Sequence, residues 1–255
     1  MLTEAHYPDW AGLHFFAEGT PYTVRIGDGP DVECPPFAVT GPTSRSIRLH
    51  LTQSVAWSLG VTPVGWARFG RCPANTLANK VVDGREHSTF SRLAPLLDIV
   101  RDGAGQTSET ARRIGEFLSR KLPPRARNES QVLALHEALR NPAIGDVDGL
   151  VEEVGVSRRT LERLSSNVFG FPPKTLLRRQ RFLRSLGKFT INPDRGWSAS
   201  LDGHYVDQAH FVRDFRSFMD MTPSEYAQMP HPILSHIFGR RLAEHTADNG
   251  RGRRI

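Results

Sequence analysis

The C-terminal half of this 255-residue sequence contains one pattern twice: a short helical segment, a turn, and a second helical segment that begins at a polar capping residue. In the first copy, residues 147–154 carry apolar side chains on one helix face. Gly155 suits the left-handed conformation that ends a helix, and Ser157 can cap the helix that follows. A helix, a tight turn and a capped helix in this order predict a helix-turn-helix unit.

The second copy covers residues 197–219. Its turn contains Gly203 and His204, and Asp207 is the expected cap of its second helix. Phe211, Phe215 and Phe218 repeat with the spacing of a buried helix face. We therefore expect a second helix-turn-helix unit.

Each unit leaves polar side chains on the outer face of its second helix, and the N-terminal turns of such a helix meet base edges in DNA complexes. In the first unit the outward residues are Arg158, Arg159, Glu162 and Arg163. In the second they are Gln208, Ala209, His210, Arg213 and Arg216. We expect these residues to face a bound duplex.

A long basic helix is expected between the two units. Pro172 and Pro173 can open a helix that continues to about residue 189, and Arg178, Arg179, Arg181 and Arg184 lie on it. From Arg158 to Lys188 the chain has nine basic residues and one acidic residue, although its net charge is only +6. A helix of this length could hold two recognition helices in successive major-groove turns, which lie about 34 Å apart.

The N-terminal half has a different periodicity. Short β-rich segments separated by Gly and Pro turns are expected at residues 13–16, 22–26, 37–40, 46–51, 55–59 and 64–69. Helical spacing begins at about residue 88, and a break with two prolines occupies residues 123–130. We expect an α+β protein: a β-rich domain closed by helices at 1–122, a linker at 123–130, an all-α domain at 131–228 with its two units joined by the long helix, and a basic tail at 229–255.

Residues 154–164, 169–182 and 205–226 resemble the AraC/XylS family of bacterial transcription regulators, and the resemblance extends over about residues 131–227. It implies a seven-helix domain that binds double-stranded DNA through both units. Matched position by position, it places base-reading side chains at Arg159, Glu162 and Arg163, and at Ala209, His210 and Arg213 with Gln208 beside them. We add Arg158 to the base-reading residues. We expect phosphate contacts from Thr160, Lys174, Arg178, Arg179 and Arg216.

The sequence departs from the family pattern in the second turn, where His204 replaces the expected glycine. Histidine adopts the left-handed conformation only at some cost, so a shifted or strained turn is expected. Ala209 is small and uncharged, so the second unit is expected to read fewer bases than the first.

Residues 57–69 and 74–83 resemble the compact N-terminal domains of one AraC-like subgroup. Such domains commonly sense an effector or dimerise, which leaves open a small-molecule effector, whose identity is unknown, and a homodimer. A contact with RNA polymerase is also left open. Two alternatives remain: an effector-binding or enzyme-like N-terminal module with an accessory DNA-binding domain, and an interaction protein with a degenerate helix-turn-helix.

Other functional classes find little support in the sequence. Cys34 and Cys72 lack the spacing of a zinc site, and His204 and His210 have no accompanying ligands, so no metal or cofactor is expected. Nucleophile-elbow, phosphate-loop and HExxH motifs are absent, which predicts a protein without a catalytic site. The chain has no long apolar stretch, and we expect a cytoplasmic bacterial regulator without a membrane partner.

Overall fold

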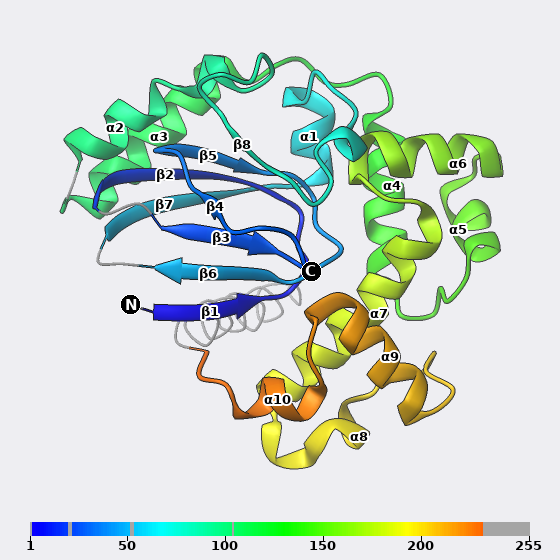
Figure 1. The fold of residues 1–255 in the computed structure, drawn as a ribbon. Coiled ribbons are helices and arrows are strands. Elements are labelled where there is room, and N and C mark those ends of the chain that lie inside the picture. Colours follow the sequence, from blue (N-terminus) through cyan, green and yellow to red (C-terminus); the bar gives the residue numbers. More distant parts are fainter. Residues whose placement is uncertain (1, 20–21, 52–53, 104, 232–255) are drawn as a thin grey trace, which may run out of the picture.

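A computed structural model describes residues 2–19, 22–51, 54–103 and 105–231 (Figure 1). A β-rich N-terminal part closed by helices is followed by an entirely helical C-terminal part, as the sequence predicted. Most of the predicted basic tail, residues 232–255, lies outside the described residues.

The N-terminal part contains two four-stranded antiparallel sheets. The first has the order β1 (Leu2–His6), β6 (Ile47–Leu51), β3 (Thr23–Ile26) and β4 (Val32–Glu33). The second has the order β7 (Ser54–Val61), β2 (Ala11–Gly19), β5 (Phe37–Thr40) and β8 (Val81–Asp83). On β2 the side chains of Leu13, Phe15 and Ala17 are buried, and every residue of β5, including Phe37, is buried. Side chains of both strands form the apolar core of this part.

Helices cover the second sheet. Helices α2 (Leu96–Asp102) and α3 (Thr107–Lys121) lie along one side of it, and apolar residues of both join the core around Phe15 (Figure 1). Short 3₁₀ turns occur at Ala74–Thr76 and Ser91–Leu93.

Residues 64–69 were expected to form a strand, and this prediction is wrong: they belong to α1 (Pro63–Phe69). The side chain of Thr62 accepts a hydrogen bond from the Gly65 amide, and Pro63 occupies the first helical turn. A capping threonine followed by proline is a helix-start signal. That signal outweighs the β-rich composition of the segment.

The C-terminal part is built from helices α4 (Glu129–Arg140), α5 (Val147–Val154), α6 (Arg158–Leu164), α7 (Pro173–Ile191), α8 (Gly196–Ser200), α9 (Gln208–Met219) and α10 (Pro223–Gln228). A π-helical turn at Ser165–Phe169 follows α6, and a 3₁₀ turn at Pro193–Arg195 follows α7. Two apolar clusters stabilise these helices, one around α4 to α7 and one around α7 to α10. No helix of the described residues is long and apolar enough to cross a membrane.

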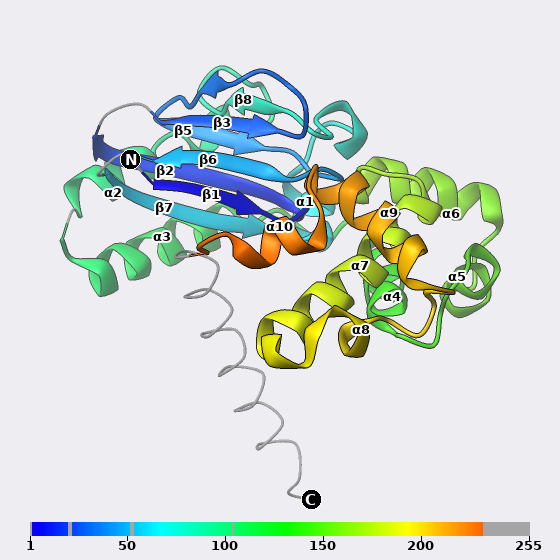
Figure 2. The same ribbon diagram turned by 60° about the horizontal axis from the view of Figure 1, so that its bottom comes forward.

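The two parts are packed against each other. Trp10, Val64 and Ala67 contact the apolar cluster around α4 to α7, and Tyr7 belongs to the cluster around α7 to α10. Figure 2 shows the two parts side by side, with α10 beside the sheets. The N-terminal part therefore contacts both halves of the helical part.

Candidate nucleic-acid interface

The first helix-turn-helix unit is formed by α5 and α6, and its turn has the predicted geometry. Asp146 caps α5, with its Oδ1 atom 2.8 Å from the Gly149 amide nitrogen. Gly155 ends α5 in the left-handed conformation, at φ 68°. Ser157 caps α6 by accepting a hydrogen bond from the Thr160 amide at 3.3 Å. These caps set the angle at which α6 leaves the turn.

Helix α6 buries Leu161 and Leu164 and leaves its other face to solvent. A surface hollow on this exposed face is lined by Arg159, Thr160, Glu162, Arg163 and Ser166. Within the described residues, no hydrogen bond or ion pair engages the guanidinium groups of Arg159 and Arg163. Both groups are available to hydrogen-bond acceptors of a partner.

Arg158 and Thr160 are already engaged within the unit. The guanidinium of Arg158 pairs with Asp148 on α5, and both side chains are exposed. The hydroxyl of Thr160 accepts a hydrogen bond from Ser157 at 3.0 Å. An exposed pair such as Arg158–Asp148 opens at little cost.

The second unit is formed by α8 and α9, and its turn lacks the expected strain. Among the described non-glycine residues only Asn79 and Asp220 have a positive φ, so His204 is not left-handed. The amide of Tyr205 donates to the Asp202 carbonyl at 3.0 Å, and the His204 amide donates to the Asp202 carboxylate at 3.1 Å. An ordinary turn closed by Asp202 therefore reverses the chain, and no left-handed residue is needed.

The ring of His204 links this turn to the first unit. Its Nε2 atom lies 2.8 Å from the carbonyl oxygen of Pro142, in the loop between α4 and α5, and donates to it. Gly145 lies against the same ring, because a Cβ atom there would approach Nδ1 to 2.4 Å. His204, which departs from the family pattern, thus links the second turn to the loop that leads into the first unit.

Helix α9 has the predicted cap and the predicted buried face. The Asp207 carboxylate accepts a hydrogen bond from the His210 amide at 2.6 Å, and Phe211, Phe215 and Phe218 are buried. On the other face, the exposed side chains are those of Gln208, Ala209, Arg213 and Arg216. The side chain of Arg213 has no hydrogen bond or ion pair among the described residues.

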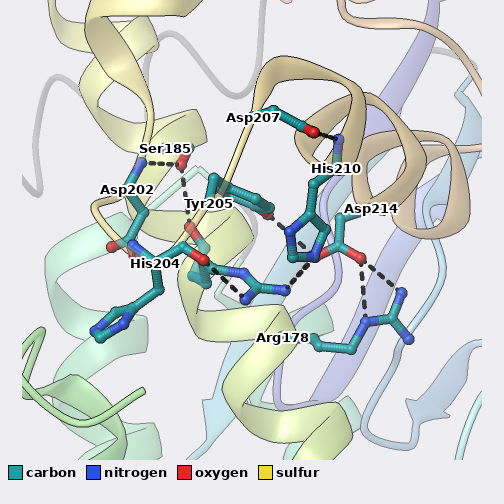
Figure 3. A network of polar contacts seen from close by, with 9 residues as sticks. Arg178, Ser185, Asp202, His204, Tyr205, Asp207, His210 and Asp214 are labelled. Carbon is teal, nitrogen blue, oxygen red and sulfur yellow. Dashed lines mark hydrogen bonds and ion pairs between the residues drawn. The ribbon is translucent and has the colours of Figure 1, made fainter. Parts of the chain in front are cut away.

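A buried carboxylate anchors α9 to α7 (Figure 3). Asp214, 4 % exposed, accepts hydrogen bonds from Arg178 at 2.7 Å and from Arg181 at 2.8 Å. The hydroxyl of Tyr205 also lies 3.3 Å from this carboxylate. Arg184 makes a similar contact with Asp202 at 2.6 Å. Three of the arginines on α7 are therefore paired with carboxylates inside the domain.

His210 is half-buried and lies in the same network. Its Nε2 atom is 3.1 Å from a guanidinium nitrogen of Arg181. Arginine only donates hydrogen bonds, so Nε2 accepts and a neutral ring carries its proton on Nδ1. The network residues Arg181, Tyr205 and Asp214 were not among the predicted site residues. The sequence signal that could have found them is Asp214, because it is the one acidic residue in α9 and the other charged residues of that helix are basic.

Arg179 was expected to contact phosphate, and this prediction is wrong. Its side chain is 1 % exposed, and the guanidinium donates to the carbonyl oxygens of Thr43 at 3.0 Å and Asp9 at 3.3 Å. It also stacks over Trp10, 3.8 Å from the ring centre. Burial lowers the pKa of Arg179 to about 10, so it remains charged at neutral pH. The N-terminal part covers the α7 face that the sequence alone left open to solvent.

The other predicted phosphate ligands differ in exposure. Lys174, at the start of α7, and Arg216, on α9, are exposed. Arg178 is partly exposed, but its guanidinium is held by Asp214.

Residues 150–229 match the family model of a helix-turn-helix domain. This match identifies the C-terminal part as a helix-turn-helix domain. No curated protein matches the sequence.

Solved structures with a similar arrangement include those of ToxT from Vibrio cholerae. An apo ToxT variant from strain SCE256, which carries one substitution, is 14 % identical, with 89 % of this chain and 93 % of that chain covered and a TM-score of 0.45. ToxT from Vibrio cholerae O395 is 14 % identical, with 89 % and 92 % covered and a TM-score of 0.44. A further structure of that protein, bound to (E)-4-(8-methylnaphthalen-1-yl)but-3-enoic acid, is 14 % identical, with 89 % and 97 % covered and a TM-score of 0.44.

Proposed function

We propose that this protein is an AraC-type transcription regulator that recognises a specific sequence of duplex DNA by placing α6 and α9 in successive major-groove segments. The observation that carries the proposal is the pair of capped helices with exposed arginines that lack partners among the described residues, Arg159 and Arg163 on α6 and Arg213 on α9. Unpaired guanidinium groups on the exposed face of a recognition helix suit guanine O6 and N7.

The distribution of paired and unpaired arginines supports this assignment. On α7, Arg178 and Arg181 share the carboxylate of Asp214 and Arg184 pairs with Asp202, so two carboxylates balance two of these three positive charges within the domain. On the outer faces of α6 and α9, by contrast, Arg159, Arg163 and Arg213 have no ion pair among the described residues. We assign phosphate contacts to Thr160, Lys174 and Arg216, because backbone contacts set the register of a recognition helix on the duplex.

The residues proposed to contact bases differ in how strongly they discriminate between base pairs. Arg159, Arg163 and Arg213 would donate to guanine, and Glu162 would accept from cytosine N4. Gln208 and Ala209 start α9, and His210 offers its Nδ1 proton while Arg181 holds Nε2. Arg158 joins the set when its exposed pair with Asp148 opens.

The N-terminal part, residues 1–122, is proposed as the regulatory domain of a cytoplasmic protein, joined by residues 123–130 to the DNA-binding domain at 131–228. Its contacts with both apolar clusters of the helical part support this role. A small-molecule effector, a second copy of the chain, or RNA polymerase would act through this domain or its surface.

Site selection from a random duplex pool, followed by affinity measurements on the selected and a scrambled duplex, tests the proposal. Arg163→Ala should cost about 1–3 kcal/mol on the selected duplex and relax the preference at one position. Arg101→Ala is the matched control, because it removes the same charge from an exposed position on α2 in the N-terminal part.

Equal losses on the selected and scrambled duplexes would contradict a base-reading role for Arg163. Failure of the pool to yield any preferred sequence, at low as well as moderate salt, would contradict sequence-specific recognition as a whole.

A further inference from the structure

Val206 is the most exposed of the large hydrophobic side chains in the described part of the chain, at 88 %. A single exposed apolar residue is ordinary on a protein surface, so exposure alone indicates nothing. The position of Val206 is more informative, because it directly precedes Asp207, the cap of recognition helix α9.

The backbone around Val206 is held on both sides. Tyr205 is buried, with its hydroxyl on the Asp214 carboxylate, and Asp207 binds the His210 amide. A β-branched side chain has few rotamers, so the two methyl groups of Val206 occupy a restricted volume in front of α9. Such an ordered apolar group can meet a partner with little further loss of conformational entropy.

The leading end of α9 differs chemically from that of α6. Val206, Gln208 and Ala209 are exposed there and present an isopropyl group, an amide and a methyl group. The corresponding face of α6 presents guanidinium groups and the carboxylate of Glu162. Glutamine pairs with adenine N6 and N7 and apolar groups contact the thymine methyl, whereas arginine and glutamate suit guanine and cytosine.

We infer that the two units read segments of different base composition, α6 a G·C-rich segment and α9 an A·T-containing segment in which Val206 packs against a thymine C5-methyl group. The inference rests on the proposed function, since both helices must enter the major groove. Exposed Arg213 and Arg216 on the same helix favour a polyanionic partner over an apolar protein surface.

The thymine contact is tested by replacing each thymine of the selected duplex with deoxyuridine, one at a time. Deoxyuridine lacks only the C5-methyl group. At one position in the α9 segment, this replacement should weaken binding of the wild-type chain about four-fold, as expected for one buried methyl group. For Val206→Ser, the same replacement should have no effect, while the preference in the G·C segment stays unchanged.

Val55→Ser is the matched control, because Val55 is also an exposed valine, 48 % exposed, and lies on β7 in the N-terminal part. It should bind both duplexes like the wild type. Circular dichroism of both variants checks that the fold is retained.

The outcomes separate this inference from the function on which it rests. A pool without any preferred sequence would overturn the proposed function. A preferred sequence with two G·C-rich segments, or one in which no deoxyuridine replacement weakens wild-type binding, would overturn the inference alone. The inference would also be overturned if Val206→Ser, compared with the wild type, weakened binding by the same factor on the thymine duplex and on the deoxyuridine duplex. Val206 would then contact a partner other than the thymine methyl group.

Discussion

Helices α6 and α9, the two proposed recognition helices, are capped in the same way but are held differently. Helix α6 has seven residues, and its arginines face solvent or an exposed carboxylate. Helix α9 has twelve, and its side chains are engaged at three points: His210 and Asp214 contact arginines of α7, and Asp220 contacts the N-terminal part. The first unit therefore offers most of its polar groups to a partner, whereas the second uses several of them for its own attachment.

The attachment of α9 to the N-terminal part lies at its C-terminal end. Asp220 ends the helix in the left-handed conformation, at φ 56°. Its carboxylate accepts hydrogen bonds from Arg45 at 3.0 Å and from the Ser46 hydroxyl at 3.1 Å, and both residues lie just before β6. Among the described residues, no hydrogen bond or ion pair ties the end of α6 to the sheets; the turn that follows α6 instead packs through Phe169 against Trp10. At these helix ends, the second unit is held to the N-terminal part by a charged contact and the first by an apolar one.

The largest expected effect is on the buried carboxylate of α9. Asp214→Asn keeps the size of the side chain but removes the charge that faces Arg178 and Arg181. Removing one partner of a buried ion pair costs about 3–5 kcal/mol, because the remaining charge stays desolvated. Urea unfolding followed by circular dichroism measures the loss.

The control for Asp214→Asn is Asp102→Asn, which breaks an exposed pair with Arg113. This pair should contribute less than about 1 kcal/mol. If the two variants lose similar stability, the buried network does not hold α9.

The next effect concerns how much sequence information each helix supplies. Arg213→Ala and Arg163→Ala should each cost about 1–3 kcal/mol on the selected duplex. The two variants should relax the preference at different positions, about 10 base pairs apart, because successive major-groove segments are separated by one helical turn. Repeating the site selection with each variant measures this.

A uniform loss for Arg213→Ala on every duplex would show that α9 supplies affinity and register only. The difference between the two units in sequence discrimination would then be larger than their exposed side chains suggest.

Local signals in the sequence were sufficient for much of this architecture. The turn at Gly155, the caps Ser157 and Asp207, and the buried phenylalanines of α9 depend on residues close together in the chain. Such short-range geometry is what periodicity and capping rules describe. The α+β class and the order of the helical units followed from the same rules.

The strand expected at 64–69 and the strain expected at His204 were wrong although their signals are local, whereas the failures at Arg179 and Asp214 depend on contacts between distant segments. Arg179 has the periodicity of an exposed residue on a basic helix, but the residues that bury it, Asp9, Trp10 and Thr43, are more than 130 positions away. The pairing of Asp214 with Arg178 and Arg181 likewise joins two helices. Short-range patterns in the sequence indicate which residues are charged. They do not indicate which charged side chains pair with one another in the fold.

A smaller effect is expected where the N-terminal part contacts α9. Arg45→Ala removes a partly exposed ion pair with Asp220 and should reduce stability by no more than about 1 kcal/mol. Hydrogen exchange should become faster at the last turn of α9, including the Asp220 amide that donates to the Arg216 carbonyl. Exchange in α6 should not change.

Arg25→Ala provides the control, since Arg25 pairs with Asp31 at an exposed site within the N-terminal part. Faster exchange in α6 as well as α9 after Arg45→Ala would mean that the two units respond together, and that the contact at Asp220 does not distinguish them.

The smallest effect on stability is expected in the first unit. Asp148→Asn breaks the exposed pair with Arg158 and should change the free energy of unfolding by less than about 1 kcal/mol. It should nevertheless strengthen DNA binding, because Arg158 becomes free to contact the duplex. If the new contact is with phosphate, the slope of log K against log salt should steepen by about 0.9. Glu153→Gln, an exposed change of the same charge on the same helix, corrects for net charge. An equal gain in DNA affinity in both variants would show that Arg158 makes no new contact. The DNA contacts of α6 arginines would then come from Arg159 and Arg163 alone.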